Sequence, residues 1–167
     1  MILTEEQTLI RDMARKFARD KLLPTAAERD RTATFPAAEM REMGALGMMG
    51  MLIPEEWGGA GTDHVAYALA MEEVSAGDGA CATLMGVQNS VLCPPILDHG
   101  TETQKERFLR PLAKGEMFGA FALTEPHTGS DAGAIRFERG DNKSVNQIFG
   151  NGRKHGFLAD ILPSAER

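Results

Sequence analysis

A short polar segment near residue 130 carries the side chains best suited to bind an anion. It reads HTGSDAGA from His127 to Ala134 and is rich in Gly, Ser, Thr and Asp, which favour turns. Successive small residues let backbone N–H groups approach a negative charge closely, and the hydroxyls of Thr128 and Ser130 add donors. The segment therefore predicts a site for a phosphate or pyrophosphate, although the same residues also suit a plain surface turn.

The other chemistry-bearing residues form no recognisable metal or catalytic motif. Cys81 and Cys93 lie twelve positions apart without a C-x-x-C, and none of the four histidines stands at a metal-ligand spacing from them. We therefore predict two buried thiols and no metal site. No histidine accompanies a Ser or Cys nucleophile motif, which argues against a hydrolytic triad. The glycines from Gly58 to Gly61 lack the G-x-G-x-x-G spacing of a dinucleotide-binding fold.

Helical patterns fill the first two thirds of the chain, so helices must position the polar segment. Thr4 and Gln7 form a capping box that starts the first helix, and Pro24 is expected to end it. A second helix is expected from Pro36 to Gly47, and Asp63 is expected to cap a third. The apolar face of the first helix is predicted to contain Leu9, Ile10, Met13 and Phe17.

Two more helices and a strand are expected between residues 79 and 126. The apolar stretch from Gly79 to His99, interrupted by Pro94 and Pro95, predicts a buried and kinked helix. A second capping box, at Thr101, begins a helix that ends near Gly115. The run FGAFALTEP then has the pattern of a strand, whereas GMMGMLIPEEWGGAG earlier in the chain predicts an extended segment running into a loop. The ten methionines favour a helical core packed with flexible side chains.

The order of these elements and the words within them resemble an acyl-CoA dehydrogenase. The matching words cover residues 1 to about 135 and end in a motif typical of that family. They are TEEQTLIRDMARKFARDKLLP, GALGMMGMLIPEEWGGAG, ALAMEEVSAGDGA, TETQKERFLRPLAKGE and FALTEPHTGSD. The resemblance implies a mainly α protein, with an N-terminal helical domain followed by the start of a β-domain.

The resemblance also implies FAD as the cofactor. It places Phe121, Ala122, Leu123 and Thr124 beside the isoalloxazine ring, where main-chain groups and the Thr124 hydroxyl would bond the polar edge of the flavin. Glu125 and Pro126 would shape the turn that follows. Gly129 and Ser130 would lie near the FAD pyrophosphate and the CoA part of the substrate, which agrees with the anion site predicted above. His127 and Thr128 stand where the family motif varies, so neither receives a role.

A substrate pocket is implied within the apolar stretch. The segment from Asn89 to Ile96 matches the family helix that lines the acyl-chain pocket, and core packing explains the same apolar pattern equally well. The residues assigned to the pocket, together with Ser130, are Asn89, Leu92, Cys93 and Ile96.

The family reaction is α,β-dehydrogenation of an acyl-CoA thioester, with electrons passed to an electron-transferring flavoprotein. A carboxylate removes the α-proton, and in the family that Glu belongs to the C-terminal domain. No Glu in this sequence matches it, so no catalytic residue is assigned and the isolated chain is expected to be inactive. The full-length family implies a homo-oligomer. A non-catalytic helical module that binds no flavin is the alternative.

Three regions are expected: a helical domain over residues 1–116, the start of the β-domain over 117–135, and a divergent tail over 136–167. The tail carries a net charge of +2, against −8 for the residues before it. A gene fragment, a frame-disrupted product and one part of a split enzyme all remain possible origins of this departure. The overall charge of −6 argues against nucleic acid as a partner. No unbroken apolar run suggests a membrane span and no signal peptide is recognised, so a cytoplasmic location is expected.

Overall fold

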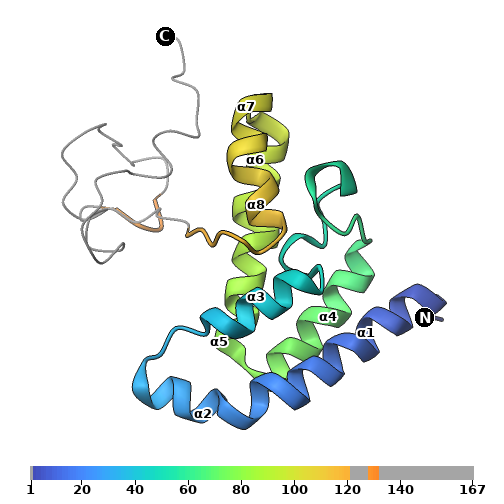
Figure 1. Cartoon of the computed structure of the whole chain (residues 1–167), viewed down its shortest axis with the longest axis vertical. Coiled ribbons are helices and arrows are strands. Elements are labelled where there is room, and N and C mark those ends of the chain that lie inside the picture. The colour runs from blue at the N-terminus through green and yellow to red at the C-terminus, as the bar shows by residue number, and fades with distance from the viewer. Residues whose placement is uncertain (1, 121–127, 132–167) are drawn as a thin grey trace. The chain divides into compact units, whose positions relative to one another are not determined.

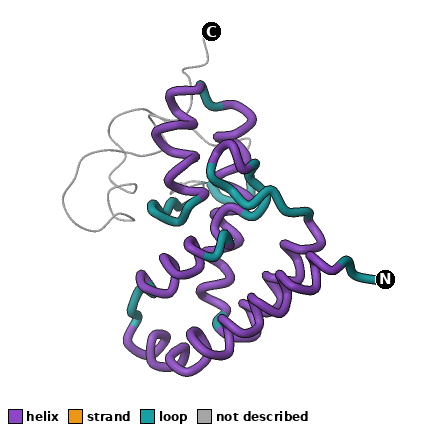
Figure 2. The backbone as a smooth tube through the Cα atoms, turned by 45° about the vertical axis from the view of Figure 1, so that its right-hand side comes forward, coloured by secondary structure: helices purple, strands orange, loops and turns teal. Residues whose placement is uncertain are grey.

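The structure, a computed structural model, describes residues 2–120 and 128–131. The chain divides into two units, Met1–Ala120 and Phe121–Arg167. Helices joined by short loops make up the described part of the first unit (Figure 2). In chain order the elements are α1 (Glu5–Phe17), η1 (Ala18–Leu22), α2 (Leu23–Thr32), α3 (Ala37–Ala45), η2 (Met48–Gly50), η3 (Glu55–Trp57), α4 (His64–Gly77), α5 (Gly79–Val87), η4 (Gln88–Leu92), α6 (Cys93–His99), α7 (Glu102–Gln104), η5 (Lys105–Leu109) and α8 (Arg110–Ala113).

Helices α1 and α4 lie side by side and form the most extensive helix pair of the domain (Figure 1). The predicted capping box starts α1: the Gln7 N–H donates to Thr4 Oγ1 and the Thr4 N–H donates to Gln7 Oε1, both at 3.1 Å. Asp63 caps α4 by accepting the Ala66 N–H at 2.7 Å, as predicted. One expected core residue is wrong, because Leu9 is 63% exposed. A helix turns about 100° per residue, which carries Leu9 about 200° away from the buried Gln7.

The prediction that Pro24 ends the first helix is wrong. The helix runs on through η1 and α2 to Thr32, and η1 is a π turn in which the Leu23 N–H donates to the carbonyl of Ala18, five residues earlier. In a regular helix the proline ring collides with the carbonyl four residues before it. A π turn widens the helix at that point, so Pro24 is accommodated as an early residue of α2.

Two later prolines are accommodated in the same way. The Cys93 N–H donates to the Gln88 carbonyl directly before Pro94, and the Arg110 N–H donates to the Lys105 carbonyl directly before Pro111. Helices α5 and α6 therefore continue one another through η4, which confirms one helix from Gly79 to His99. Contrary to the expectation that no stretch suggests a membrane span, this helix is long and apolar enough to cross a membrane, and 44% of its most apolar window is buried inside the domain.

Methionines make up much of the core, as the composition predicts. Flexible thioether side chains fill the space between α3, η2 and α5 without strict demands on shape. The buried methionines are Met40, Met43, Met48, Met49, Met51 and Met85.

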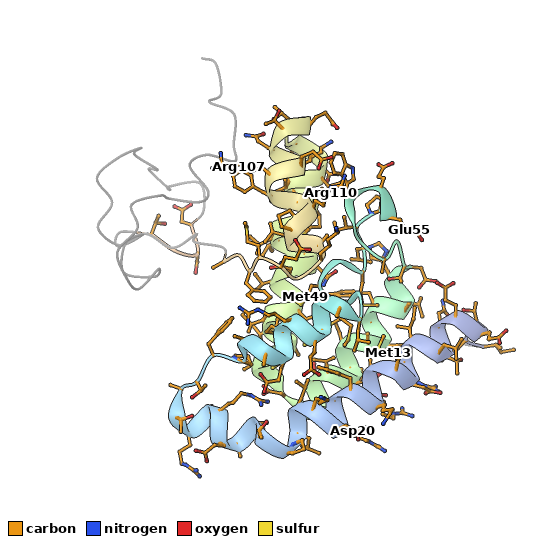
Figure 3. The ribbon with its side chains drawn as sticks, in the orientation of Figure 1. Met13, Asp20, Met49, Glu55, Arg107 and Arg110 are labelled. Atoms are coloured by element: carbon orange, nitrogen blue, oxygen red, sulfur yellow. The ribbon has the colours of Figure 1, made fainter. Side chains whose placement is uncertain are left out.

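The segment after α3 is not extended as expected, but forms two 3-10 turns, η2 and η3. Gly47 begins the first with φ of 77°, a conformation that glycine adopts without strain. The second carries Trp57, whose ring lies 5.5 Å from Lys105 Nζ and 5.4 Å from the Arg110 guanidinium. Figure 3 shows Arg110 directed toward the loop that carries Glu55, and Arg107 directed away from it.

Helix α3 packs closely against the end of α8. A Cβ at Gly44 would lie 2.5 Å from the Lys114 carbonyl oxygen and 2.8 Å from the Gly115 Cα. Both are backbone atoms, so the neighbour cannot move aside as a flexible side chain would. Gly115 itself has φ of 70° and ends the last helix where the sequence predicts.

Candidate functional site

The described part of the predicted anion site is a turn. The Thr128 hydroxyl donates to the Asp131 carbonyl at 2.7 Å and closes the turn around Gly129 and Ser130. The Thr128 O–H is therefore bonded within the turn, and its role as a donor for a ligand stays a prediction. Ser130 is exposed and Gly129 is half-buried, so the Ser130 side chain remains accessible. The predicted flavin residues Phe121 to Pro126 lie outside the described residues.

The backbone that leads toward this motif is held by the end of the last helix. The carbonyl of Pro111 accepts the N–H groups of Glu116 and Met117 at 2.9 and 3.1 Å. This arrangement pairs a carbonyl in the last turn of α8, which a helix end otherwise leaves unsatisfied. Residues 116 and 117 therefore follow a defined path away from the helix.

Residues 116–119 are called the approach below, because they precede the motif. Gln88, which the sequence analysis did not single out, also holds them. Its side chain is 1% exposed, and its Nε2 donates to the carbonyls of Leu112 at 2.8 Å and Met117 at 2.9 Å. Its Oε1 accepts the N–H of Gly119 at 3.4 Å. One buried carboxamide therefore joins η4, the end of α8 and the two residues flanking Phe118. Its signal in the sequence was a pair of adjacent carboxamides within an otherwise apolar helix, since buried amides need partners.

Asn89, the other carboxamide of that pair, was assigned to the acyl-chain pocket and turns to a different part of the domain. It is fully buried, and its Nδ2 donates to the carbonyls of Met48 at 2.8 Å and Met85 at 3.0 Å. Among the described residues its Oδ1 has no hydrogen-bond partner. Asn89 therefore joins η4 to η2 and makes no bond to the approach at residues 116–119.

The remaining residues assigned to the pocket, Leu92, Cys93 and Ile96, are also buried, at 3%, 0% and 3% exposure. Leu92 lies beneath the approach, because a Cβ at Gly119 would be only 2.7 Å from Leu92 Cδ1. Burial raises the pKa of the Cys93 thiol to about 12, so this side chain stays neutral and suits an apolar wall. These positions satisfy both core packing and pocket lining, and the pocket assignment stays a prediction.

An aromatic contact completes the surroundings of the approach. The rings of Phe118 and Phe35 are 6.0 Å apart at 59° to one another, a tilted geometry that aromatic pairs favour. Phe35 is 53% exposed. Phe118 therefore turns toward the loop before α3, while its two neighbours bond to Gln88.

A buried ionic cluster lies elsewhere, where α2, α3 and α5 meet. Arg29 donates to Asp78 at 2.6 Å and to Glu39 at 2.9 Å. Burial opposes the charge on Asp78, yet the bond from Arg29 and the N–H groups of Ala80 and Cys81 hold the pKa of this carboxyl below its usual value. The charges of the cluster pair with one another, Arg29 Nε has no hydrogen-bond partner among the described residues, and Asp78 caps α5. Its arrangement is that of a structural tie between helices.

No group of three metal-binding side chains occurs within residues 2–120 and 128–131. Cys81 and Cys93 are free and buried, as predicted. Burial also raises the pKa of the Cys81 thiol to about 12. Neither thiol is therefore ionised near neutral pH, and neither is poised as a nucleophile.

Comparison with known proteins identifies the family. The family model described as the acyl-CoA dehydrogenase N-terminal domain matches residues 4–116, more than half of the chain. The chain belongs to the acyl-CoA dehydrogenase family. The helical fold of its described part agrees with the mainly α class predicted from the sequence.

Relatives within the acyl-CoA dehydrogenase family are substantially longer. The short-chain specific acyl-CoA dehydrogenase of Clostridium acetobutylicum is 44% identical over 147 residues, which cover 86% of this chain and 39% of the relative. Butyryl-CoA dehydrogenase from Megasphaera elsdenii superposes with a TM-score of 0.73 at 38% identity, over 79% of this chain and 35% of that one. A structure described as the electron transferring flavoprotein of Acidaminococcus fermentans gives a TM-score of 0.76 at 42% identity, over 80% and 35%. The chain thus spans two fifths or less of the length of these relatives.

Proposed function

We propose that the chain supplies the N-terminal helical domain and the first flavin-binding segment of an FAD-dependent acyl-CoA dehydrogenase. The observation that carries the proposal is the family match over residues 4–116, which leads directly into the motif FALTEPHTGSD. The reaction proposed is α,β-dehydrogenation of acyl-CoA thioesters, and the short-chain specific relative favours short acyl chains. In this reaction bound FAD supplies the hydride acceptor.

In the proposed site the residues of this chain bind and orient the cofactor and the substrate. Main-chain groups of residues 121–124 and the Thr124 hydroxyl bond the polar edge of the flavin. Ser130 donates to the FAD pyrophosphate or to the CoA moiety, and its exposed position on a closed turn fits that task. Glu125 and Pro126 shape the turn. Leu92, Cys93 and Ile96 form the apolar side of the acyl-chain pocket, whereas Asn89, whose carboxamide bonds the carbonyls of Met48 and Met85, is left out of the proposed pocket.

The isolated chain is expected to bind without turning over. Removal of the α-proton needs a carboxylate against the thioester, and none of the residues of this chain matches the family's catalytic Glu. In the complete enzyme the proposed partners are an acyl-CoA, an electron-transferring flavoprotein and further copies of the same subunit. The neighbour described as an electron transferring flavoprotein supports the second of these. A cytoplasmic location is part of the same proposal.

Reconstitution of the purified chain with FAD tests the proposal. After removal of free cofactor, the preparation should be yellow with flavin absorbance, and it should show no turnover with butyryl-CoA and an artificial electron acceptor. A colourless preparation that FAD does not reconstitute favours the non-catalytic helical module instead. A measured dehydrogenase rate would contradict the expectation of inactivity.

A single-residue variant tests the predicted anion site. Ser130→Ala should weaken FAD binding about tenfold, because it removes one hydrogen bond to a charged phosphate oxygen. Ser90→Ala is the matched control, since its hydroxyl is also exposed and donates to the carbonyl of Gly86 within its own helix. Equal FAD affinity in Ser130→Ala and the wild type would remove Ser130 from the site.

A further inference from the structure

We infer that Gln88 is a positioning residue that orders residues 117–119, directly before the proposed flavin-binding motif, by bonding the backbone of Met117 and Gly119. The inference rests on the proposed function, and it concerns a residue that the family motif does not contain. Gln88 bonds both sides of Phe118, and Phe121 follows Gly119 by two residues in the chain. One side chain therefore bonds the backbone on both sides of Phe118, shortly before the motif begins.

Both protons of the Gln88 Nε2 and its Oε1 are used in hydrogen bonds to backbone groups. Its Nε2 has two protons, which go to the carbonyls of Leu112 and Met117 at 2.8 and 2.9 Å, and its Oε1 accepts the Gly119 N–H at 3.4 Å. The side chain is 1% exposed, so water does not replace these bonds if they break. Loss of the carboxamide leaves two carbonyls and one N–H without their partners.

Packing beneath the approach leaves it little alternative path. Leu92 Cδ1 lies 2.7 Å from the position of a Cβ at residue 119, so an added methyl there would require the end of the Leu92 side chain to shift. Phe118 between the two bonded residues packs on Phe35. Two hydrogen bonds, one ring contact and one close approach therefore hold three consecutive residues.

Prior ordering of these residues matters for binding. Fixing the backbone of a residue costs conformational entropy, and a ligand that must order the segment itself loses the corresponding affinity. In the unliganded protein the hydrogen bonds of Gln88 already order residues 117–119, so the ligand does not have to. Its removal should weaken FAD binding even though Gln88 makes no contact with the cofactor.

Adjacent residues offer matched controls. Asn89 is a buried carboxamide in the same π turn, and its bonds go to Met48 and Met85 rather than to the approach. Asn89→Leu should therefore lower the melting temperature about as much as Gln88→Met, without loosening residues 117–119. Ser90→Ala, in the same turn and exposed, should change neither property.

The experiment combines amide hydrogen exchange with FAD titration on the full chain. Gln88→Met should raise exchange in residues 117–119 at least tenfold and weaken FAD binding about tenfold or more, whereas Asn89→Leu should leave both near wild type. Gln88→Asn keeps a carboxamide but withdraws it by one methylene from Met117 and Gly119, so it should weaken FAD binding similarly. This second variant decides the matter if Gln88→Met does not fold.

Three results would overturn the inference. One is wild-type FAD affinity in Gln88→Met, or in Gln88→Asn if Gln88→Met does not fold. Another is an equal loss of FAD affinity in Asn89→Leu, which would trace the effect to general stability. A wild-type chain that takes up no FAD contradicts the proposed function and this inference together, and so differs from the first two results.

Discussion

The two sides of the helical domain are tied by different chemistry. Around α1, α2 and α4 the ties are ionic: Arg15 bonds Glu73 in a bidentate pair, and Arg29 bonds Asp78. Around η4, η2 and α8 the ties are the neutral carboxamides of Gln88 and Asn89, each bonding backbone carbonyls. The ionic side joins helices to one another, whereas the carboxamide side also holds residues 117–119, which precede the motif FALTEPHTGSD.

This difference separates stability from binding. A broken ionic tie should lower the free energy of unfolding and leave the approach at residues 116–119 intact. A broken tie at Gln88 should loosen that approach. Variants on the ionic side should change stability alone, and variants at Gln88 should also change FAD affinity. If stability and FAD affinity fall together in every variant, the distinction between the two sides is wrong.

The largest loss of stability is expected on the ionic side, from Arg29→Met. The variant leaves Asp78 as a buried charge without its cation, which typically costs about 3–5 kcal/mol. Urea unfolding measures the loss. Arg31→Met is the control, since Arg31 pairs with Glu28 on the exposed surface and should change stability little. FAD affinity of the folded fraction should stay at the wild-type value, and a parallel loss of affinity would break the contrast between the two sides.

A smaller loss is expected from Gly44→Ala, where α3 meets the end of α8. The added methyl collides with backbone atoms of Lys114 and Gly115, and such overpacking costs about 1–3 kcal/mol. Gly79→Ala is the control, because no neighbouring atom lies within 4 Å of a Cβ there, and alanine favours the helix. Thermal unfolding should show opposite signs for the two variants. Equal melting temperatures of the two variants would show that the backbone of Lys114 and Gly115 shifts at little cost to accept the added methyl.

The smallest effect is expected from acid. The hydrogen bond from Arg15 lowers the pKa of Glu73, and the bond from Arg29 helps to lower that of Asp78 against the effect of burial. A carboxyl with a depressed pKa in the folded state stabilises the protein above its unfolded value, near 4, and loses that contribution as the pH falls through the folded value. Unfolding from pH 6 to pH 2 should therefore show a loss of stability beginning near pH 4. Asn89→Leu should lose stability over the same pH range as the wild type, because Asn89 does not titrate. In Arg29→Met the free energy of unfolding should depend less on pH in this range.

Local signals predicted much of the fold. The capping boxes at Thr4 and Thr101 and the cap at Asp63 depend on residues three positions apart, so the sequence alone reveals them. Pro24 was misjudged because a local rule ends the helix there, whereas the packing of α1 and α2 continues it through a π turn. The family was predicted from longer sequence motifs, which the local rules for helix starts and ends do not explain.

The candidate site was predicted less completely. Gln88 was missed because its partners lie 24 to 31 residues further along the chain, and no local pattern indicates them. Asn89 was found by resemblance, yet its bonds to Met48 and Met85 follow from packing alone. Polar residues inside an apolar helix were the available signal, since each must find a partner when buried.

Hydrogen exchange at the turn Thr128–Asp131, measured with and without ligand, tests the central claim most directly. FAD should slow exchange at Gly129 and Ser130, because we propose that their N–H groups donate to its pyrophosphate. Riboflavin, which lacks the phosphates, should leave these amides unchanged. Identical exchange in the presence and absence of saturating FAD would contradict the claim that this turn is a flavin-binding element.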